Sequence, residues 1–417
     1  MPEDSGLDAY RVDNSGPLEK PSAGSTVSAQ DRIDYFHYQT FHRGLIGPGL
    51  APTILRFRKA IRERIGALGV NSSGWSEAND LFVLLGKAVS SALTEAICGP
   101  SLLRLHPDFI DNLWAYDKWH VYAHQRFQEN DIGPDNDSDP YWGSHMIRHL
   151  NQTLVGGGKQ SDDAMSAHDL GLIWGATTNP ASAAALAVIH IFEDADLLSR
   201  VRSELGTHLS YPLSPSSFVT LDTKEFNKLP LLSSVYSETM RLHSNVFLMS
   251  ASPPDTDVHL GKWKFPRGSF GLVSPALAHM DESFWNTKDD KYPVDTFWAD
   301  RFLVYPADPA SGPVRPEARA EGMIERLGKQ KREDKSDDEP YYSTAGLEGS
   351  WLPYGAGVGM CPGRFLAKDV IISTCALLVS EYEVEIFTES VDMDPWRFGL
   401  GVGRPRSPIA ARIRKRS

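Results

Sequence analysis

Apolar residues recur at three- and four-residue spacing along most of the chain, which is the pattern of amphipathic helices. The segment 78–99, ANDLFVLLGKAVSSALTEAICG, keeps this spacing and stops at Gly99, a residue type that commonly ends helices. The segment 162–194, DDAMSAHDLGLIWGATTNPASAAALAVIHIFED, is the longest apolar stretch of this kind. Pro180 lies inside it and predicts a kink or a weakened turn near Ala176. The pattern predicts a chain that is mainly helical from residue 31 onward.

Three stretches depart from the helical period. Residues 258–273, VHLGKWKFPRGSFGLV, alternate and turn at Gly261 and Gly268, which predicts a small β-hairpin. Residues 1–30 are rich in Ser, Gly, Pro and Asp and predict a flexible N-terminal lead. Residues 306–347 are also polar and predict a surface excursion. The expected fold class is mainly α with a minor β region.

The amino-acid composition argues against several classes of protein. The 417 residues are 41% hydrophobic, and the net charge of −12 argues against nucleic acid as the main partner. Three cysteines cannot form a disulfide framework and fit a reducing compartment. The N-terminus has no apolar core of the kind that a secretory signal contains. The sequence also has no run of about 18 consecutive apolar residues, which a transmembrane anchor would need. We expect an intracellular protein, either cytoplasmic or peripherally associated with the endoplasmic reticulum.

One cysteine stands in an unusual loop, YGAGVGMCPGR at residues 354–364. Glycines at 355, 357 and 359 let the backbone bend and aim N–H groups at the sulfur of Cys361. Pro362 suits the first turn of a helix, and Gly363 leaves room for a flat group. A lone thiolate cannot make a structural zinc site, but it can be the single axial ligand of a haem iron. A buried, unreactive cysteine is the alternative, and it is our interpretation of Cys98 and Cys375.

At these residues the chain resembles the cytochrome P450 family. The loop follows that family's aromatic-Gly-x-Gly-x-Arg-x-Cys-x-Gly pattern, except that Gly359 replaces the arginine. Upstream, SETMR resembles the family's Glu-x-x-Arg pair through Glu238 and Arg241, and FWADRF places Arg301 as third member of a charged network. Taken alone, Glu238 and Arg241 could be an ordinary exposed ion pair one helical turn apart.

The resemblance covers roughly residues 31–417 and implies a single haem-binding domain there. It implies haem b as cofactor, with Cys361 as axial thiolate ligand and with Tyr354, Gly355 and Gly363 among the haem-binding residues. The tail PWRFGLGVGRPRSPIAARIRKR is similar to the branch that contains prostacyclin synthase, the sterol 7α-hydroxylases and fungal biosynthetic oxygenases. Relative to the family, the chain lacks part of the N-terminal β-rich region.

The family's long helix usually carries an acid and a threonine over the iron. Alignment on Pro180 places Thr177 at the acid position and Thr178 at the threonine position. We therefore expect Thr178, with Thr177 or Asn179, to handle protons during catalysis, although a hydroxyl cannot act as a charged base. The alternative is that both threonines bond back to carbonyls of their own helix.

The cations that usually bind the haem propionates are largely absent. Gly359 occupies one arginine position and Ser252 falls near another. The resemblance makes Arg43 the first candidate for a propionate ligand and His42 the second, although Gln39 is a poor match for the family's aromatic companion. Arg43 could equally be a solvated surface cation.

The family's substrate-contact regions correspond to three segments. They contain Ile173 and Trp174 in 170–176, Val246, Phe247 and Leu248 in 245–250, and the glycine-rich stretch 399–403. Each segment could instead be plain core packing.

The resemblance implies three readings of the function. The first is a haem-thiolate monooxygenase that oxidises a small apolar substrate in secondary-metabolite or lipid-like biosynthesis. It would use dioxygen and electrons from a separate NADPH-dependent cytochrome P450 reductase, since the chain shows no flavin domain. The second is a reductase-independent isomerase or dehydratase. The third is a non-catalytic, truncated member of the family.

Overall fold

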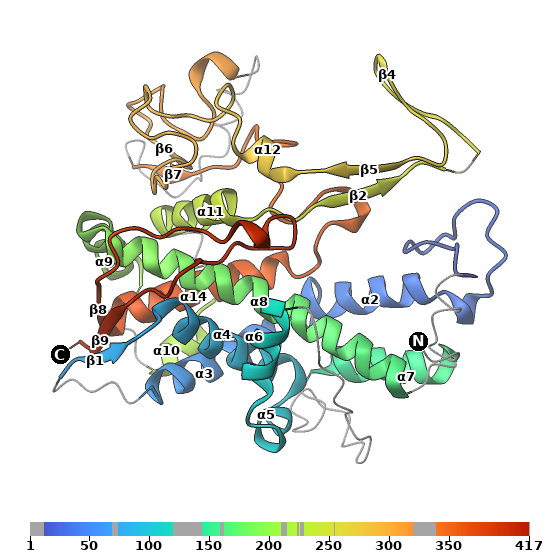
Figure 1. The fold of residues 1–417 in the computed structure, drawn as a ribbon, viewed down its shortest axis with the longest axis horizontal. Helices are drawn as coiled ribbons and strands as arrows, with labels where there is room; N and C mark the ends of the chain where they lie inside the picture. Colours follow the sequence, from blue (N-terminus) through green and yellow to red (C-terminus); the bar gives the residue numbers. More distant parts are fainter. Residues whose placement is uncertain are drawn as a thin grey trace. The chain divides into compact units, whose positions relative to one another are not determined.

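The computed structural model describes residues 12–68, 74–119, 144–158, 162–209, 215–222, 225, 229–253, 255–319 and 339–416. It is built mainly from helices with a few short strands, as the sequence predicted (Figure 1). The chain forms two compact units that interleave in sequence. Unit 1 comprises 1–225, 362–389 and 408–417, and unit 2 comprises 226–361 and 390–407.

Unit 1 carries the long helices. Its elements are η1 (Ala29–Asp31), α2 (Ile33–Leu45), α3 (Leu50–Gly66), β1 (Ser76–Ala78), α4 (Leu81–Cys98), α5 (Ser101–Leu105), α6 (Phe109–Trp119), α7 (His145–Gly158), α8 (Asp162–Glu193), α9 (Ala195–His208), α10 (Pro215–Thr220), α14 (Arg364–Glu381), β8 (Tyr382–Ile386) and β9 (Ala411–Lys415). Helix α8 packs against α4 and α14, and α3 packs against α4. The strands form one antiparallel sheet in the order β1-β9-β8.

The two ends of α4 show how local sequence determines where a helix begins and ends. The Asp80 side chain accepts a hydrogen bond from the Val83 N–H at 3.2 Å and caps the first turn. Gly99 ends the helix with φ of +80°, a backbone conformation that favours glycine. The predicted stop at Gly99 is confirmed.

Two core helices are apolar enough to be examined as membrane spans. Windows in Leu81–Cys98 and Ser166–Glu193 have mean hydropathies of 1.6 and 1.3, and 72% and 67% of these windows are buried inside the protein. Burial of that extent is expected of core helices in a large unit.

Unit 2 carries one long helix and short antiparallel ribbons. Its elements are α11 (Pro230–His243), β2 (Leu248–Ala251), β3 (Val258–Leu260), β4 (Trp263–Phe265), β5 (Phe270–Val273), α12 (Pro275–His279), β6 (Leu303–Val304), η3 (Pro316–Ala318), β7 (Tyr341–Tyr342), η4 (Gly357–Gly359) and η5 (Pro395–Arg397). Strands pair as β2–β5, β3–β4 and β6–β7. The predicted hairpin is the β3–β4 pair, which turns at Gly261 with φ of +61°.

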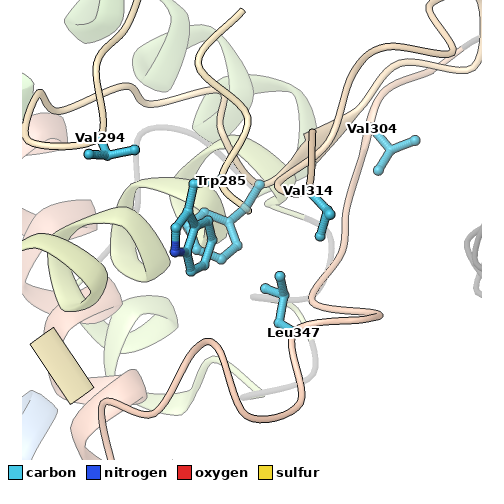
Figure 2. Close-up of a cluster of buried hydrophobic side chains, with 6 residues drawn as sticks. Trp285, Val294, Val304, Val314 and Leu347 are labelled. Atoms are coloured by element: carbon cyan, nitrogen blue, oxygen red, sulfur yellow. The ribbon is translucent and has the colours of Figure 1, made fainter. Parts of the chain in front are cut away.

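A buried apolar cluster centred on Trp285 forms the core of one part of unit 2 (Figure 2). The Trp285 indole N–H donates to the Ala278 carbonyl at 2.8 Å, so its polar edge is satisfied inside the core. The other members of the cluster are Val294, Phe302, Val304, Val314 and Leu347.

Two polar segments make packed contacts in parts of their described residues. In 306–347, Val314 and Leu347 are core residues, residues 306–310 are exposed, and residues 320–338 lie outside the described part. Residues 12–30 were expected to be a flexible lead, but several of their carbonyls accept hydrogen bonds from the buried Arg32 guanidinium, including Glu19 O at 2.7 Å. A buried guanidinium needs such acceptors, and the polar segment provides them.

Candidate functional site

The cysteine loop in unit 2 is a tight turn closed by its own backbone. The Cys361 N–H donates to the Tyr354 carbonyl at 2.9 Å, and the 3₁₀ turn of residues 357–359 lies between them. Gly355 and Gly357 have φ of +76° and +67°, where an L side chain is strained. The thiol of Cys361 is exposed and outside any disulfide, whereas Cys98 and Cys375 are buried. Only Cys361 among the three is placed to meet a ligand.

The loop is anchored to the rest of unit 2 at its N-terminal side. The Leu352 N–H donates to His279 Nε2 at 2.9 Å, and the Ser244 hydroxyl donates to the Pro353 carbonyl at 3.1 Å. Burial, together with the nearby Arg241 cation, lowers the pKa of His279 to about 4, so the neutral ring can accept this bond. The residues that anchor the loop, His279 and Ser244, were not identified by sequence analysis.

A second hydroxyl stands beside Tyr354. The Tyr236 hydroxyl donates to the Tyr354 hydroxyl at 2.9 Å. Burial is the main cause that raises the pKa of both phenols, and the Cys361 sulfur adds to it. Both phenols therefore stay neutral, and the proton of Tyr354 remains available for donation. No sequence signal identified Tyr236, because its partner is 118 residues away.

The predicted charged network is assembled and fully buried in unit 2. Helix α11 presents Glu238 and Arg241, whose ion pair has Nε–Oε2 and Nη2–Oε1 distances of 2.8 Å. Arg301 Nε donates to Glu238 Oε1 at 2.9 Å, and all three side chains are 0% exposed. Burial alone would raise the pKa of Glu238, but Arg241 and Arg301 outweigh it and lower the pKa. The exposed-pair alternative for Glu238 and Arg241 is therefore wrong.

The substrate-contact segment of unit 2 is exposed. Val246 and Phe247 are 37% and 38% exposed, and Leu248 is half-buried. The Phe247 N–H donates to the Gly399 carbonyl at 3.2 Å, which joins this segment to the 399–403 stretch. Gly399 has φ of +86°, and a Cβ there would lie 2.2 Å from the Phe247 ring. Two predicted substrate-contact segments thus meet, with Val246, Phe247 and Leu400 exposed and residues 401–403 buried.

The remaining predicted residues lie in unit 1. Thr177 and Thr178 are buried on α8 and donate to the Ile173 and Trp174 carbonyls at 2.7 and 2.9 Å. This is the back-bonded geometry of the alternative interpretation. Asn179 is half-buried on the same helix.

Ile173 and Trp174 are engaged within unit 1. Ile173 is 2% exposed, and the Trp174 indole N–H donates to Asp117 Oδ1 at 2.6 Å. Sequence analysis missed Asp117, a buried acid 57 residues upstream. Ile173 has the burial of a core residue, as the core-packing alternative predicts.

The cationic candidates lie at the end of α2, also in unit 1. Arg43 is exposed, and the half-buried His42 ring lies 4.0 Å from the Tyr38 ring, centroid to centroid. Gly363 precedes α14 as its N-cap residue. Ser252, at the position of a usual arginine, is buried, and its hydroxyl donates to the Pro266 carbonyl at 2.5 Å.

The donor set around Cys361 fits a haem rather than a bare metal ion. Within the described residues, no group of three or more His, Cys, Asp or Glu side chains could hold a metal. A haem brings four ring nitrogens of its own and asks the protein for one axial bond on this side. A Cβ built at Gly357 or Gly359 meets no atom within 4 Å, so the loop leaves space beside the thiol.

Comparison with known proteins finds similarity to cytochrome P450 enzymes. The cytochrome P450 family model matches residues 116–302. The chain is 29% identical to the cytochrome P450 monooxygenase efuG of Hormonema carpetanum, over 89% of this chain and 70% of that protein. It is 26% identical to the monooxygenase fsoE of Humicola fuscoatra, over 93% and 72%. Prostacyclin synthase of Bos taurus is 25% identical over 66% of this chain and 49% of its own length.

The fold agrees with these sequence matches. A crystal structure of a cytochrome P450, CYP102L1, superposes with a TM-score of 0.55 and 16% identity, covering 99% of this chain and 84% of that chain. The predicted fold class is confirmed. The chain is therefore similar to cytochrome P450 enzymes of the branch that includes fungal biosynthetic monooxygenases and prostacyclin synthase.

Proposed function

We propose that this chain is a haem-thiolate monooxygenase that holds haem b through Cys361 and oxidises a small apolar substrate. The observation that carries the proposal is the exposed Cys361 thiol on a glycine loop closed at 2.9 Å by its own N–H. When bound, haem b supplies the activation of dioxygen and the one-electron steps. The residues of the chain supply ligation, orientation and proton handling.

Cys361 supplies the axial thiolate, and its loop keeps the sulfur in place. The anchoring bonds from Ser244 and from Leu352 to His279 fix the approach to the loop. Burial of the Tyr236 and Tyr354 phenols keeps neutral hydroxyls near the sulfur, so no second negative charge competes with the thiolate. Gly355, Gly363 and Tyr354 are the further residues that would hold the flat ring.

Proton handling is assigned to α8. Thr178 is the donor, with Thr177 or Asn179 as its partner. Both threonine hydroxyls donate to helix carbonyls, at 2.7 and 2.9 Å. A hydroxyl next to a proline can exchange that bond for one to a bound molecule, because Pro180 has no N–H and loosens the turn around it.

The haem propionates are assigned to Arg43, with His42 as second choice, because the loop position of the usual arginine holds Gly359. Electrons come from a separate NADPH-dependent cytochrome P450 reductase. The proposed location is intracellular, in the cytoplasm or at the surface of the endoplasmic reticulum. The branch favours a substrate from secondary-metabolite or lipid-like biosynthesis.

The substrate is assigned to the apolar surface formed by Val246, Phe247 and Leu248 with the 399–403 stretch. Phe247 and Phe398 make an edge-to-face contact with ring centroids 5.6 Å apart, so the two aromatic rings brace each other. Ile173 and Trp174 of unit 1 are the further substrate-contact residues that the resemblance implies. An apolar wall of this kind selects for shape and hydrophobicity rather than for charge.

The reduced carbon-monoxide difference spectrum tests the proposal. The unmodified chain and the Cys98→Ser control should give the red-shifted band typical of thiolate-ligated haem. Cys361→Ser should lose that band while keeping its far-ultraviolet circular dichroism. A colourless unmodified protein would favour the non-catalytic reading, and an unchanged band in Cys361→Ser would show that another residue is the ligand.

One observation favours a second function. The acid position on α8 is Thr177, and neither threonine proton points away from the helix carbonyls. An isomerase or dehydratase that rearranges a peroxide or a biosynthetic intermediate needs no delivery of external electrons and protons. Turnover without NADPH and reductase would support this function, and strict dependence on both would exclude it.

A further inference from the structure

Helix α6 in unit 1 carries an acid on its buried face. The apolar members of that face are Ile110, Leu113 and Trp114, which are all buried. Asp117 shares the face by its spacing along the helix and is 2% exposed. A carboxylate among apolar side chains is unfavourable unless it accepts hydrogen bonds. One such bond comes from α8, which packs against α6, because the Trp174 indole N–H donates to Asp117 Oδ1 at 2.6 Å.

The face of α8 around Trp174 is open. Gly171, Trp174, Gly175 and Thr178 lie within about a third of the helix circumference, by the 3.6-residue period. Both glycines are exposed, and a Cβ built on either of them meets no atom within 4 Å. Trp174 is half-buried and is the one large side chain among these four residues. The orientation of its ring therefore decides how much space this face leaves for another molecule.

We propose that Asp117 is a positioning residue, which fixes the Trp174 indole and so sets the shape of the substrate wall on α8. The inference rests on the proposed function, which makes Trp174 a substrate contact. A hydrogen bond to a carboxylate is roughly twice as strong as one between neutral groups, so it can select one ring orientation among several. A fixed indole leaves the glycine-lined part of the face free, whereas a mobile one would occupy that part for some of the time.

The size of the effect follows from the population of that orientation. A ligand that needs the fixed ring has an apparent dissociation constant equal to the intrinsic one divided by the fraction of chains that already hold the ring. Loss of a hydrogen bond to a charged group shifts such an equilibrium by about 10-fold or more. Removal of the Asp117 carboxylate should therefore weaken ligands that reach the wall and spare ligands that do not.

Binding of two probes to the haem-loaded chain tests the wall. Imidazole and 4-phenylimidazole both bind a haem iron through a ring nitrogen, but only the second carries an apolar ring large enough to need the wall. In Asp117→Ala, the dissociation constant for 4-phenylimidazole should rise about 10-fold, while that for imidazole should stay nearly unchanged. Asp117→Asn keeps a carbonyl oxygen for the indole N–H and should restore most of the affinity.

Failure of Asp117→Asn to restore the affinity would overturn the inference, because it would mean that the acid acts through its charge or its proton. Trp174→Phe gives a second test of the pair. Phenylalanine has no N–H, so Asp117→Ala should have little further effect in that background. The same loss in both backgrounds would show that Asp117 does not act through Trp174.

A matched control separates positioning from a merely structural role. The Trp114 indole N–H, on the same helix α6, donates to the Ser90 hydroxyl at 3.0 Å. Ser90→Ala removes the acceptor of another buried indole in unit 1. This variant should lose some stability, but the ratio of the two dissociation constants should not change. An equal change of the ratio in Ser90→Ala and Asp117→Ala would overturn the inference.

Fluorine NMR of the full chain, labelled with 5-fluorotryptophan, observes the ring directly. The chain has 10 tryptophans, and the resonance that is missing from Trp174→Phe belongs to Trp174. It should be single and sharp in the unmodified chain and in Asp117→Asn, but shifted or broadened in Asp117→Ala. An unchanged resonance in Asp117→Ala would overturn the inference. Absence of the thiolate-type carbon-monoxide band would instead refute the proposed function and would leave this result intact, so the two failures can be told apart.

Discussion

Substitution of Glu238 by glutamine should destabilise the protein strongly, because this carboxylate is the only counter-ion that the described residues provide in this buried network. It accepts two hydrogen bonds from Arg241 at 2.8 Å, one from Arg301 Nε at 2.9 Å and one from the Trp298 N–H at 3.2 Å. The remaining donors of Arg301 reach backbone carbonyls, such as those of Pro293 and Thr296 at 3.2 Å. The carboxylate alone balances two buried positive charges.

The magnitude follows from what glutamine leaves behind. Glutamine keeps the volume but removes the charge, and its amide places N–H donors against at least one guanidinium N–H. Removal of one partner from a buried pair costs about 3–5 kcal/mol in the free energy of unfolding. A whole protein is stable by only about 5–15 kcal/mol. The substitution should therefore remove a large fraction of the stability of unit 2.

Urea unfolding followed by tryptophan fluorescence measures this loss. Trp285 and Trp298 lie under the Arg241 and Arg301 guanidinium groups, at 5.3 Å from ring centroid to Cζ, so they report on the network. With a slope of about 3 kcal/mol per M, the midpoint should fall by about 1 M or more. Glu317→Gln makes the same chemical change at an exposed ion pair and should leave the midpoint nearly unchanged. Equal midpoints for the two variants would refute the reasoning.

The pH dependence of the free energy of unfolding provides a second, independent test of the role of Glu238. Because the two guanidinium groups outweigh burial, the pKa of Glu238 in the folded state lies below its ordinary 4.5. The unfolded chain therefore takes up the proton first, and this stabilisation is lost as the pH falls below about 4.5 toward the folded-state pKa. The stability difference between the unmodified chain and Glu238→Gln should be constant above that value and shrink below it. A difference that grows on acidification would contradict this assignment.

Three further substitutions test other parts of the structure by the same denaturation assay. Asp369→Asn should cost about 3–5 kcal/mol, because Arg58 Nη2 lies 2.6 Å from the Asp369 carboxylate and both side chains are buried. Gly399→Ala should cost about 1–3 kcal/mol from its φ of +86°, and it should also change substrate-induced spectral shifts because the new Cβ displaces the Phe247 ring. Tyr236→Phe should cost about 1 kcal/mol, because it removes the hydrogen bond from the buried phenol to Tyr354.

The features that sequence analysis predicted correctly are set by local chemistry. The end of α4 at Gly99 depends on one residue and the turn that precedes it. The Glu238–Arg241 pair depends on a spacing of three along one helix, which places both side chains on the same face. The β3–β4 hairpin depends on alternation and a glycine turn. Each of these signals is complete within a few neighbouring residues.

Contacts between distant residues leave no such signal. The pair Arg58–Asp369 spans 311 residues, and the pair Tyr236–Tyr354 spans 118. A tyrosine on an amphipathic helix is compatible with core packing, with exposure or with a hydrogen bond, and the choice depends on what the fold brings to it. The anchors of the cysteine loop are of this kind. This is why the loop was found from its sequence while His279 and Tyr236, which lie beside it, were not.

Two polar segments show what an average over composition leaves out. Residues 12–30 and the described ends of 306–347 are polar on average, and an average over a window predicts exposure. Packing is decided by single side chains instead. Arg32 orders the first segment because a buried guanidinium requires several oxygen acceptors, which a glycine- and serine-rich backbone can supply. Val314 and Leu347 hold the second against the Trp285 cluster, so a few apolar residues are enough to fix a polar segment to a core.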